Sequence, residues 1–207
     1  MSSLTRRPSP TTRRREAIEQ RVLSAVEDLL ATGRSYVELS VQELADAAGV
    51  ARSTFYVHFA DKSELLVRLA EATMADIFET GERWMTGPRD GGPDELRRVG
   101  RQIIADYRRH EPLLRAVGAA TAYDPIVATW WHGRIHAFID VTVERLERDR
   151  DEGVLDAGVA IRPTAAMVVW SIERTVSMTV ATTGPDHDDE LADAVSRGIW
   201  LIMYGTV

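Results

Sequence analysis

Residues 40–66 read SVQELADAAGVARSTFYVHFADKSELL. The opening SVQE is a capping box: the serine side chain accepts a hydrogen bond from the amide three residues later, and the glutamate side chain accepts one from the serine amide. This box predicts a short helix over 41–48. Gly49 supplies a turn, and a second short helix is expected over about 52–59, with its phenylalanines facing inward. Two short helices joined by a glycine turn indicate a helix-turn-helix, whose second helix is sized for the roughly 12 Å major groove of DNA.

Longer helices are expected on both sides of this pair. Apolar residues recur at helical spacing from Glu16 until Gly33, which ends a first helix that braces the pair. A second capping box, DKSE at 61–64, opens a long fourth helix that reaches about Met85. The turn-forming stretch GPRDGGP, residues 87–93, is the clearest break in the chain.

The rest of the chain has the same helical character. It shows no sustained strand alternation and no internal repeat, so the expected fold class is all-α with about nine helices. The Ser/Pro/Arg-rich residues 1–12 are expected to form a disordered arm, 13–60 a three-helix helix-turn-helix domain, and 61–207 a larger helical domain. The five further helices are expected at roughly 94–110, 112–121, 125–151, 163–183 and 188–204.

The composition excludes several classes of site. The 207 residues contain no cysteine, so disulfides, thiolate zinc sites and cysteine nucleophiles are excluded. No apolar run approaches the roughly 18 residues of a membrane span and no secretion signal is evident, so we expect a soluble cytoplasmic protein. The net charge of −7 is uneven: residues 1–62 hold nine Lys/Arg and eight Asp/Glu, a balance of +1, whereas the remainder carries 16 and 24, a balance of −8. This distribution leaves a nucleic-acid partner open despite the acidic total.

The stretch from about Ile18 to Leu66 resembles the N-terminal signature of the TetR family of bacterial transcriptional regulators. The glycine, Thr-Phe-Tyr, His-Phe and Lys that follow one another between residues 49 and 62 fall at the family's offsets. The resemblance implies that 41–48 and 52–59 are the paired helices. It also implies that homodimers insert two recognition helices into successive major grooves of a palindromic DNA operator.

Polar residues of the paired helices are candidates for DNA contacts. Arg52 and Ser53 are suited to reading base edges, Arg52 by a bidentate bond to guanine, and Gln42 is the next candidate. By resemblance, the phosphate contacts fall to Thr54, Tyr56, His58 and Lys62. Ordinary packing beside the phenylalanines is the alternative for the tyrosine and the histidine. Ala51 departs from the family pattern because it gives the recognition helix no capping side chain.

The acidic remainder is expected to bind a ligand. The resemblance implies a regulatory domain with a pocket for a small apolar effector, and ERDRDEGVL followed by IERTVSMTV is similar to the subgroup of the mycobacterial ethionamide-resistance repressor. Converging apolar stripes favour an elongated cavity, although a solid core requires the same spacing. A carboxylate at Glu173 either binds the ligand or pairs with Arg174 or a neighbouring helix. The candidate lining residues are Leu96, Ile103, Tyr107, Trp130, Trp131, Phe138, Val169, Ile172, Glu173, Val176 and Trp200.

The last two expected helices, 163–183 and 188–204, are the predicted homodimer interface. The residues expected to pack there are Ala165, Val168, Ile172, Val195, Ile199 and Ile202. His132 and His136 stand one helical turn apart, but no further ligand type lies nearby, so we expect no metal site and no cofactor.

These observations predict a ligand-released transcriptional repressor that is not an enzyme, since the sequence contains no catalytic triad, phosphate loop or metal motif. One alternative is a DNA-binding regulator without a ligand response. A less favoured alternative is an enzyme that uses the helical pocket.

Overall fold

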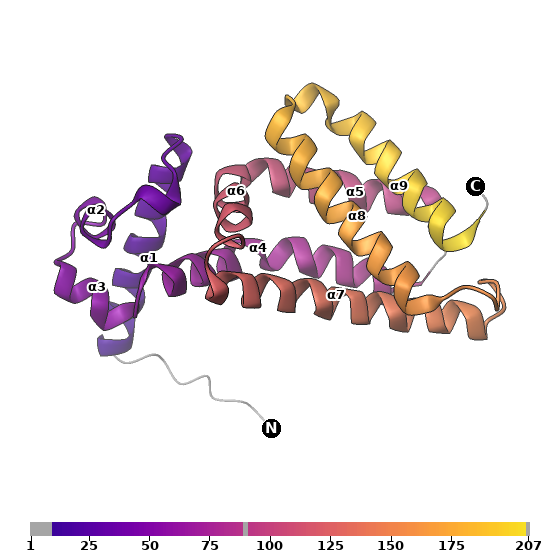
Figure 1. The fold of residues 1–207 in the computed structure, drawn as a ribbon, viewed down its shortest axis with the longest axis horizontal. Coiled ribbons are helices and arrows are strands. Elements are labelled where there is room, and N and C mark those ends of the chain that lie inside the picture. The colour runs from indigo at the N-terminus through magenta and orange to yellow at the C-terminus, as the bar shows by residue number, and fades with distance from the viewer. Residues whose placement is uncertain (1–9, 89–90, 206–207) are drawn as a thin grey trace. The chain divides into compact units, whose positions relative to one another are not determined.

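A computed structural model describes residues 10–88 and 91–205 of the chain, all of them helix, turn or irregular structure with no strand among them (Figure 1). The all-α prediction is therefore confirmed for this part of the chain. Residues 1–9 of the expected arm lie outside the described residues. Residues 10–12 already belong to the first helix, so the expected arm is too long at its end.

The chain divides into two compact units, Met1–Leu69 and Ala70–Val207, which are described separately below. The first unit carries the expected pair of short helices after a long one. Its core is built around Phe55 and Phe59, both buried, together with Val22, Val26 and Leu44. Its elements are α1 (Pro10–Ala31), the 3₁₀ helix η1 (Tyr36–Glu38), α2 (Val41–Ala47), α3 (Arg52–His58) and the first turns of α4 (Lys62–Thr86).

Both predicted capping boxes bind backbone amides. The Ser40 hydroxyl accepts from the Glu43 N–H, and the Glu43 carboxylate accepts from the Ser40 N–H. The Ser40 N–H, with the Arg34 guanidinium and the Ser40 hydroxyl, lowers the pKa of Glu43 to about 2. At the start of α4, Asp61 accepts from the Glu64 N–H as expected. The Glu64 carboxylate, however, accepts from the N–H of Ala60 rather than from that of Asp61.

The first unit extends to Leu69, beyond the boundary expected after residue 60. The reason is that the first turns of α4 are part of its core: Leu65 and Leu66 are buried, and the Tyr36 hydroxyl donates to the carbonyl of Lys62. Helix α4 therefore begins in one unit and ends in the other.

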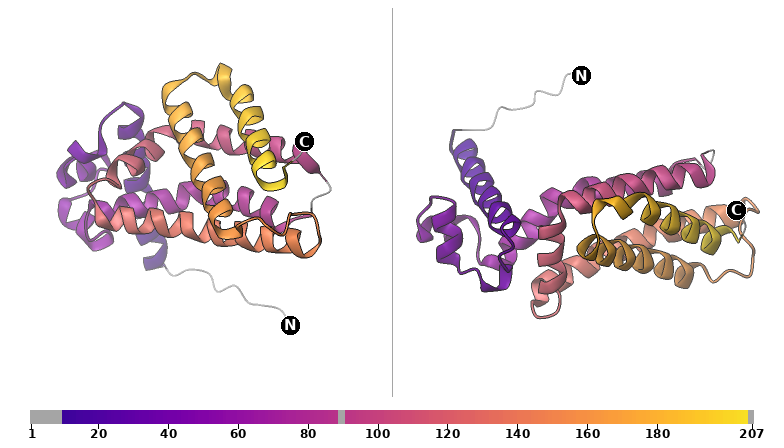
Figure 2. Two further views of the ribbon diagram at one scale, coloured as in Figure 1. Left: turned by 45° about the vertical axis from the view of Figure 1, so that its right-hand side comes forward. Right: turned by 90° about the horizontal axis from the view of Figure 1, so that it is seen from above.

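The second unit contains the remainder of α4 and five further helices close to the expected ranges. In Figures 1 and 2, α8 and α9 form an antiparallel pair, and α5 packs against α9. The buried core includes Ile77 of α4, Ile104 of α5 and Val176 of α8. The elements after α4 are α5 (Gly92–Arg109), α6 (Glu111–Ala120), α7 (Pro125–Asp151), α8 (Ile161–Thr182), η2 (Pro185–His187) and α9 (Asp188–Tyr204).

A buried ion pair ties α7 to the ends of α4 and α9. The Arg145 Nε lies 3.0 Å from Oδ2 of Asp149, one turn along α7, and both side chains are almost fully buried. The Arg145 Nη1 donates to the carbonyls of Trp84, Met85 and Gly87, which the end of α4 leaves without helical partners. The Tyr204 hydroxyl donates to Asp149 at 2.7 Å.

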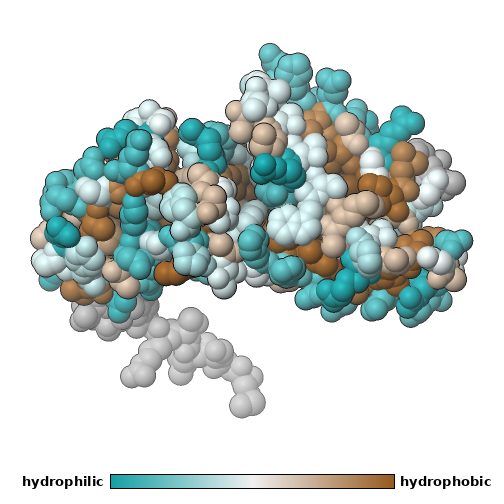
Figure 3. Space-filling model, in the orientation of Figure 1, coloured by the Kyte–Doolittle hydropathy of each residue, from teal (hydrophilic) through white to brown (hydrophobic). Residues whose placement is uncertain are grey.

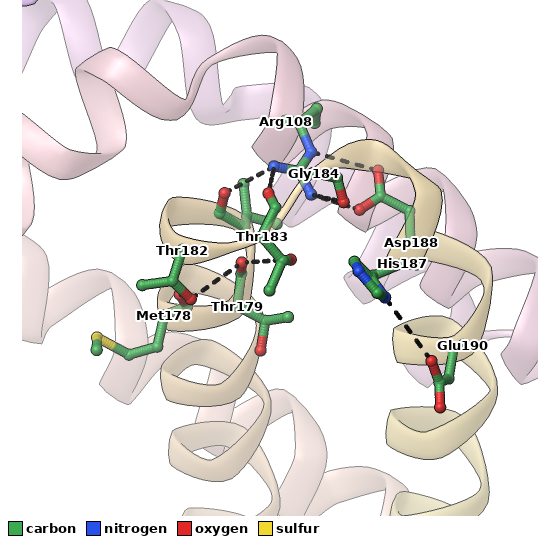
Figure 4. Close-up of polar contacts among 10 residues, drawn as sticks. Arg108, Met178, Thr179, Thr182, Thr183, Gly184, His187, Asp188 and Glu190 are labelled. Atoms are coloured by element: carbon green, nitrogen blue, oxygen red, sulfur yellow. Dashed lines mark hydrogen bonds and ion pairs between the residues drawn. The ribbon is translucent and has the colours of Figure 1, made fainter.

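A second arginine closes the connection between α8 and α9 (Figure 4). Arg108 of α5 donates to the carbonyls of Val180 and Thr183 at the end of α8, and its guanidinium also binds the carboxylate of Asp188 at the start of α9. One side chain thus satisfies the carbonyl end of one helix and holds the first residue of the next.

Candidate functional site

Helix α3 has one buried face and one exposed face. Phe55 and His58 are buried, whereas Arg52, Ser53, Tyr56 and Val57 are exposed. Thr54 lies between the two faces and is partly buried. The exposed fraction of Val57 is 73%, the largest among the exposed large hydrophobic residues of the chain's described part. We call Arg52, Ser53, Tyr56 and Val57 the α3 face.

Arg52 and Tyr56 are neighbours on the α3 face, one helical turn apart. The Arg52 Nη2 lies 3.4 Å from the Tyr56 hydroxyl, and the guanidinium carbon is 5.7 Å from the centre of the tyrosine ring. A guanidinium held in this way is partly ordered before it meets a partner, which lowers the entropy cost of binding. Gln42 of α2 is also exposed, and its side-chain amide donates to Asp46.

The turn between α2 and α3 requires glycine and is held by Arg21. Gly49 has a φ of 63°, in the left-handed region that favours glycine. The Arg21 Nη2 donates to the carbonyls of Ala48 at 2.6 Å and Gly49 at 2.9 Å. Sequence reasoning missed Arg21, because it lies on a different helix 28 positions before Gly49 and has no motif of its own. It fixes the turn that sets the orientation of α3.

The structure places His58 in the core rather than on the α3 face. Its exposed fraction is 7%, and its Nδ1 lies 3.2 Å from a carboxylate oxygen of Glu19. Burial raises the pKa of Glu19, but hydrogen bonds from Arg15 and His58 and the charge of Arg68 outweigh burial and hold that pKa below its ordinary value. The expected phosphate contact of His58 is therefore replaced by a packing role that joins α3 to α1.

Lys62, expected to contact a DNA phosphate, instead forms hydrogen bonds within the chain. Its ammonium donates to the carbonyls of Val37 at 2.7 Å and Leu39 at 3.1 Å, and a longer bond reaches the carbonyl of Tyr36. These contacts fix η1 against the start of α4. The three donors of the ammonium already have acceptors within the chain, so a phosphate contact would need them to be released.

Two narrow apolar cavities lie between the helices of the second unit. The inner cavity, of about 60 Å³, is lined by Ile77, Phe78, Gly81, Ile103, Tyr107, Ile135, Phe138, Val169, Ile172 and Glu173. The distal cavity, of about 70 Å³, shares Gly81, Ile103, Phe138 and Ile172 with the inner one and continues toward Val195, Ser196 and Ile199. Ligand pockets usually have volumes of roughly 300–1,000 Å³, so both cavities are smaller than a typical ligand pocket.

The Phe138 side chain lines both cavities. A Cβ atom placed on Gly81 would lie 2.7 Å from the Cζ of Phe138, which is closer than such atoms approach. The ring therefore rests directly on the α4 backbone at Gly81.

A wider opening, the outer pocket of about 280 Å³, lies among α5, α6, α7 and α8. Tyr107 and Glu173 line both the outer pocket and the inner cavity. These two side chains are therefore common to the walls of both spaces. The remaining residues of the outer pocket include Glu111, Arg115, Trp131, Arg174, Ser177 and Met178.

Most of the predicted lining residues border one of these three spaces, and two do not. Trp130 donates from its indole nitrogen to Glu71 of α4 at 3.1 Å. Trp200 packs against the Tyr204 ring, with centroids 4.6 Å apart. Ile77, Phe78 and Gly81 also line the inner cavity. Sequence reasoning missed them, because α4 carries an apolar stripe like that of any packed helix.

The surface of α8 and α9 carries exposed apolar side chains. Figure 3 shows hydrophobic side chains over the part of the face where Figure 1 places these two helices. The exposed large hydrophobic residues are Met167, Trp170 and Met178 on α8 and Leu201 and Ile202 on α9. We call these five residues the α8/α9 face.

The residues expected at a dimer interface differ from this set. Ala165, Val168 and Ile199 are buried within the chain, and Ile172 and Val195 pack against the core cluster that contains Ile104 and Val176. Of the expected set, Ile202 alone is exposed. The expected register on α8 was therefore wrong: the helix turns Val168 inward and Met167 outward.

The histidine pair on α7 has no partners for a metal. Both side chains are exposed, and His132 faces the Trp170 ring edge-on with centroids 6.1 Å apart. No group of three or more potential metal-binding side chains occurs within residues 10–88 and 91–205. In the same part of the chain, no helix is both long and apolar enough to span a membrane.

Two family descriptions match the chain. Residues 29–69 match the sequence model of the family described as bacterial regulatory proteins, tetR family. Residues 96–205 match the model of the C-terminal domain of the transcriptional regulator EthR. The HTH-type transcriptional regulator EthR of Mycolicibacterium smegmatis is 28% identical over 194 residues, which cover 91% of this chain and 87% of that protein. EthR of Mycobacterium tuberculosis is 27% identical over 189 residues, with coverages of 90% and 87%.

Solved structures share the fold at lower identity. The regulator FadR from Bacillus subtilis in complex with stearoyl-CoA matches with a TM-score of 0.72 at 18% identity, covering 91% of this chain and 99% of that chain. The TetR family regulator PfmR from Thermus thermophilus matches with a TM-score of 0.65 at 19% identity, with coverages of 91% and 96%. The helical architecture is therefore common to all of them.

Proposed function

The chain belongs to the TetR family of bacterial regulatory proteins, in its EthR-like subgroup, and from this premise we propose that it is a ligand-released repressor. In this proposal a homodimer binds a palindromic operator. A small molecule bound in the second unit releases the operator. The observation that carries the proposal is the α3 face, a set of exposed side chains on a short helix whose other face is fixed by the core.

Each side chain of the α3 face has a chemistry suited to DNA. Arg52 can donate two hydrogen bonds to the O6 and N7 of guanine, and Ser53 can bond to several bases. Val57 offers an apolar surface of the kind that contacts the methyl group of thymine. The Tyr56 hydroxyl suits a phosphate oxygen, and Thr54 beside it can add a second bond of the same type. Gln42 is kept as a candidate on α2, whereas His58 and Lys62 are assigned to packing.

Substitutions on the α3 face separate base reading from phosphate binding. Arg52→Ala is expected to weaken the free energy of operator binding by about 1–3 kcal/mol. It should also relax the base preference at one position of each half-site. Tyr56→Phe removes one hydroxyl and is expected to weaken binding about equally on all sequences. Fluorescence anisotropy with operator duplexes that vary one base pair at a time measures both effects. If the two variants exchanged these effects, the roles given to Arg52 and Tyr56 would have to be reversed.

The α8/α9 face supports the homodimer part of the proposal. Single exposed apolar side chains are normal on a protein surface, but this face groups five large ones on two adjacent helices. Apolar patches of this kind mark association surfaces. A twofold axis through this face would pair α8 and α9 of one protomer with those of its partner, which gives an isologous four-helix packing.

Helix α4 supports a route from ligand to DNA. Its first turns up to Leu69 belong to the unit that contains α3, whereas its later residues Ile77, Phe78 and Gly81 line the inner cavity. Phe138, which lines this cavity, rests on the α4 backbone at Gly81, so in the proposal a ligand that moves Phe138 acts directly on α4. In the proposal, the ligand favours a position of α4 in which two recognition helices no longer fit successive major grooves. The free energy by which the ligand weakens operator binding then equals the difference between its binding free energies for the DNA-binding conformation and the released conformation.

A further inference from the structure

Glu173 occupies a special position in the wall of the ligand space. It is partly buried and is the one acidic side chain that lines the inner cavity, whose other lining residues are apolar, aromatic or glycine. It also lines the outer pocket. A molecule that occupies both spaces therefore contacts the Glu173 carboxylate.

Arg174 follows Glu173 directly on α8 and also lines the outer pocket, and its charge favours the ionised carboxylate. The two side chains nevertheless form no ion pair within the described residues. Arg115, which also lines the outer pocket, binds Glu111 at 3.0 Å, and Arg134 lies over the Phe78 ring at 4.4 Å from its centroid. Burial raises the pKa of the Glu173 carboxyl, and the Ser177 hydroxyl and the charge of Arg174 only partly oppose this rise. A partner of opposite charge would compensate the cost of desolvation.

The surroundings of Glu173 suit an organic ammonium group. Tyr107 and Trp131 are both buried aromatic residues that line the outer pocket beside it. Aromatic faces attract cations, by roughly 0.5–2 kcal/mol depending on desolvation. A charge-assisted bond from an ammonium to a carboxylate is about twice as strong as a neutral hydrogen bond. A ligand carboxylate would instead meet a like charge in a poorly solvated space.

We propose that the effector is an amphipathic amine, whose ammonium group binds the Glu173 carboxylate and whose apolar tail enters the inner cavity beside Phe138. This inference rests on the proposed function, because it assumes that the second unit takes a ligand. It changes the expected effector from a purely apolar molecule to one with a single cationic end.

The test compares three molecules with the same tail, octylamine, 1-octanol and octanoate, on the full-length protein near neutral pH and below micelle-forming concentrations. Calorimetric titration is expected to show octylamine binding at least tenfold more tightly than octanol, with octanoate weakest. Glu173→Gln is expected to lower the affinity for octylamine by tenfold or more and to change the affinity for octanol by less than twofold. The matched control is Glu111→Gln, at a carboxylate of the outer pocket that already has Arg115 as its partner.

The outcomes separate this inference from the proposed function, because operator binding is measured in parallel. Octylamine affinity that falls in Glu173→Gln but not in Glu111→Gln supports the inference, even if octylamine does not release DNA. The inference is overturned if octylamine does not bind or if octanol and octanoate bind as tightly as octylamine does. It is also overturned if Glu173→Gln leaves the affinity for octylamine unchanged. Release of the operator by octanol or octanoate would then still support a ligand-released repressor.

Discussion

Asp149→Ala is expected to lower the free energy of unfolding of the second unit by about 3–5 kcal/mol, because it leaves the buried Arg145 guanidinium without its carboxylate. The total stability of a domain is commonly about 5–15 kcal/mol, so this loss is a large share of it. The substitution also removes the acceptor of the Tyr204 hydroxyl on α9. Denaturant unfolding followed by tryptophan fluorescence measures the effect, since all five tryptophans lie beyond residue 80.

Asp140→Ala is the matched control for this prediction. Asp140 lies on the same helix and pairs with Arg162 at 2.8 Å, but both side chains are largely exposed. Exposed ion pairs typically contribute about 0–1 kcal/mol, so this variant should unfold close to the parent protein. Equal losses in Asp149→Ala and Asp140→Ala would mean that the Arg145 guanidinium is solvated and that the buried pair does not hold α7 to α4.

Leu201→Glu is expected to dissociate the proposed homodimer and to weaken operator binding by about 10²–10⁴-fold. Leu201 belongs to the α8/α9 face and is exposed in the single chain, so the substitution should leave the protomer folded. A twofold axis would place two new carboxylates in an apolar interface, where charges without partners are costly. A monomer binds one half-site only and loses the gain from two linked binding events. Light scattering after size-exclusion chromatography measures the mass, and anisotropy measures the DNA affinity.

Ile126→Glu provides the control for the dimer prediction. Ile126 is about half exposed and stands in the first turn of α7, outside the α8/α9 face. An acidic residue is tolerated near the start of a helix because the helix dipole favours negative charge there. This variant should therefore remain dimeric and bind the operator. A dimeric Leu201→Glu protein with undiminished affinity would place the interface elsewhere on the chain.

Local signals in the sequence were sufficient to predict the helices. The box at Ser40 and Glu43, the glycine at 49 and the prolines near helix starts all act within a few residues, and the structure places α2, α3 and α7 close to their expected ranges. Buried and exposed faces of α3 follow from the same period, since Phe55 and Phe59 anchor the core side.

The roles of individual polar residues depended on partners far along the chain. His58 meets Glu19 and Lys62 meets the carbonyls of η1, and the separations of 39 and 23–26 positions leave no local trace in the sequence. The register of α8 was ambiguous for a different reason: the helix carries large apolar residues on both sides, so periodicity alone does not tell a core face from an association face.

The most direct measurement is the affinity of the full-length protein for a duplex carrying the promoter upstream of its own gene, compared with a random duplex of equal length at moderate salt. If the α3 face reads DNA, the promoter should bind at least about 10³-fold more tightly than the random duplex. Arg52→Ala should narrow that ratio, whereas Asp140→Ala should not. Equal affinities for the two duplexes would contradict the assignment of α2 and α3 as a sequence-reading helix-turn-helix.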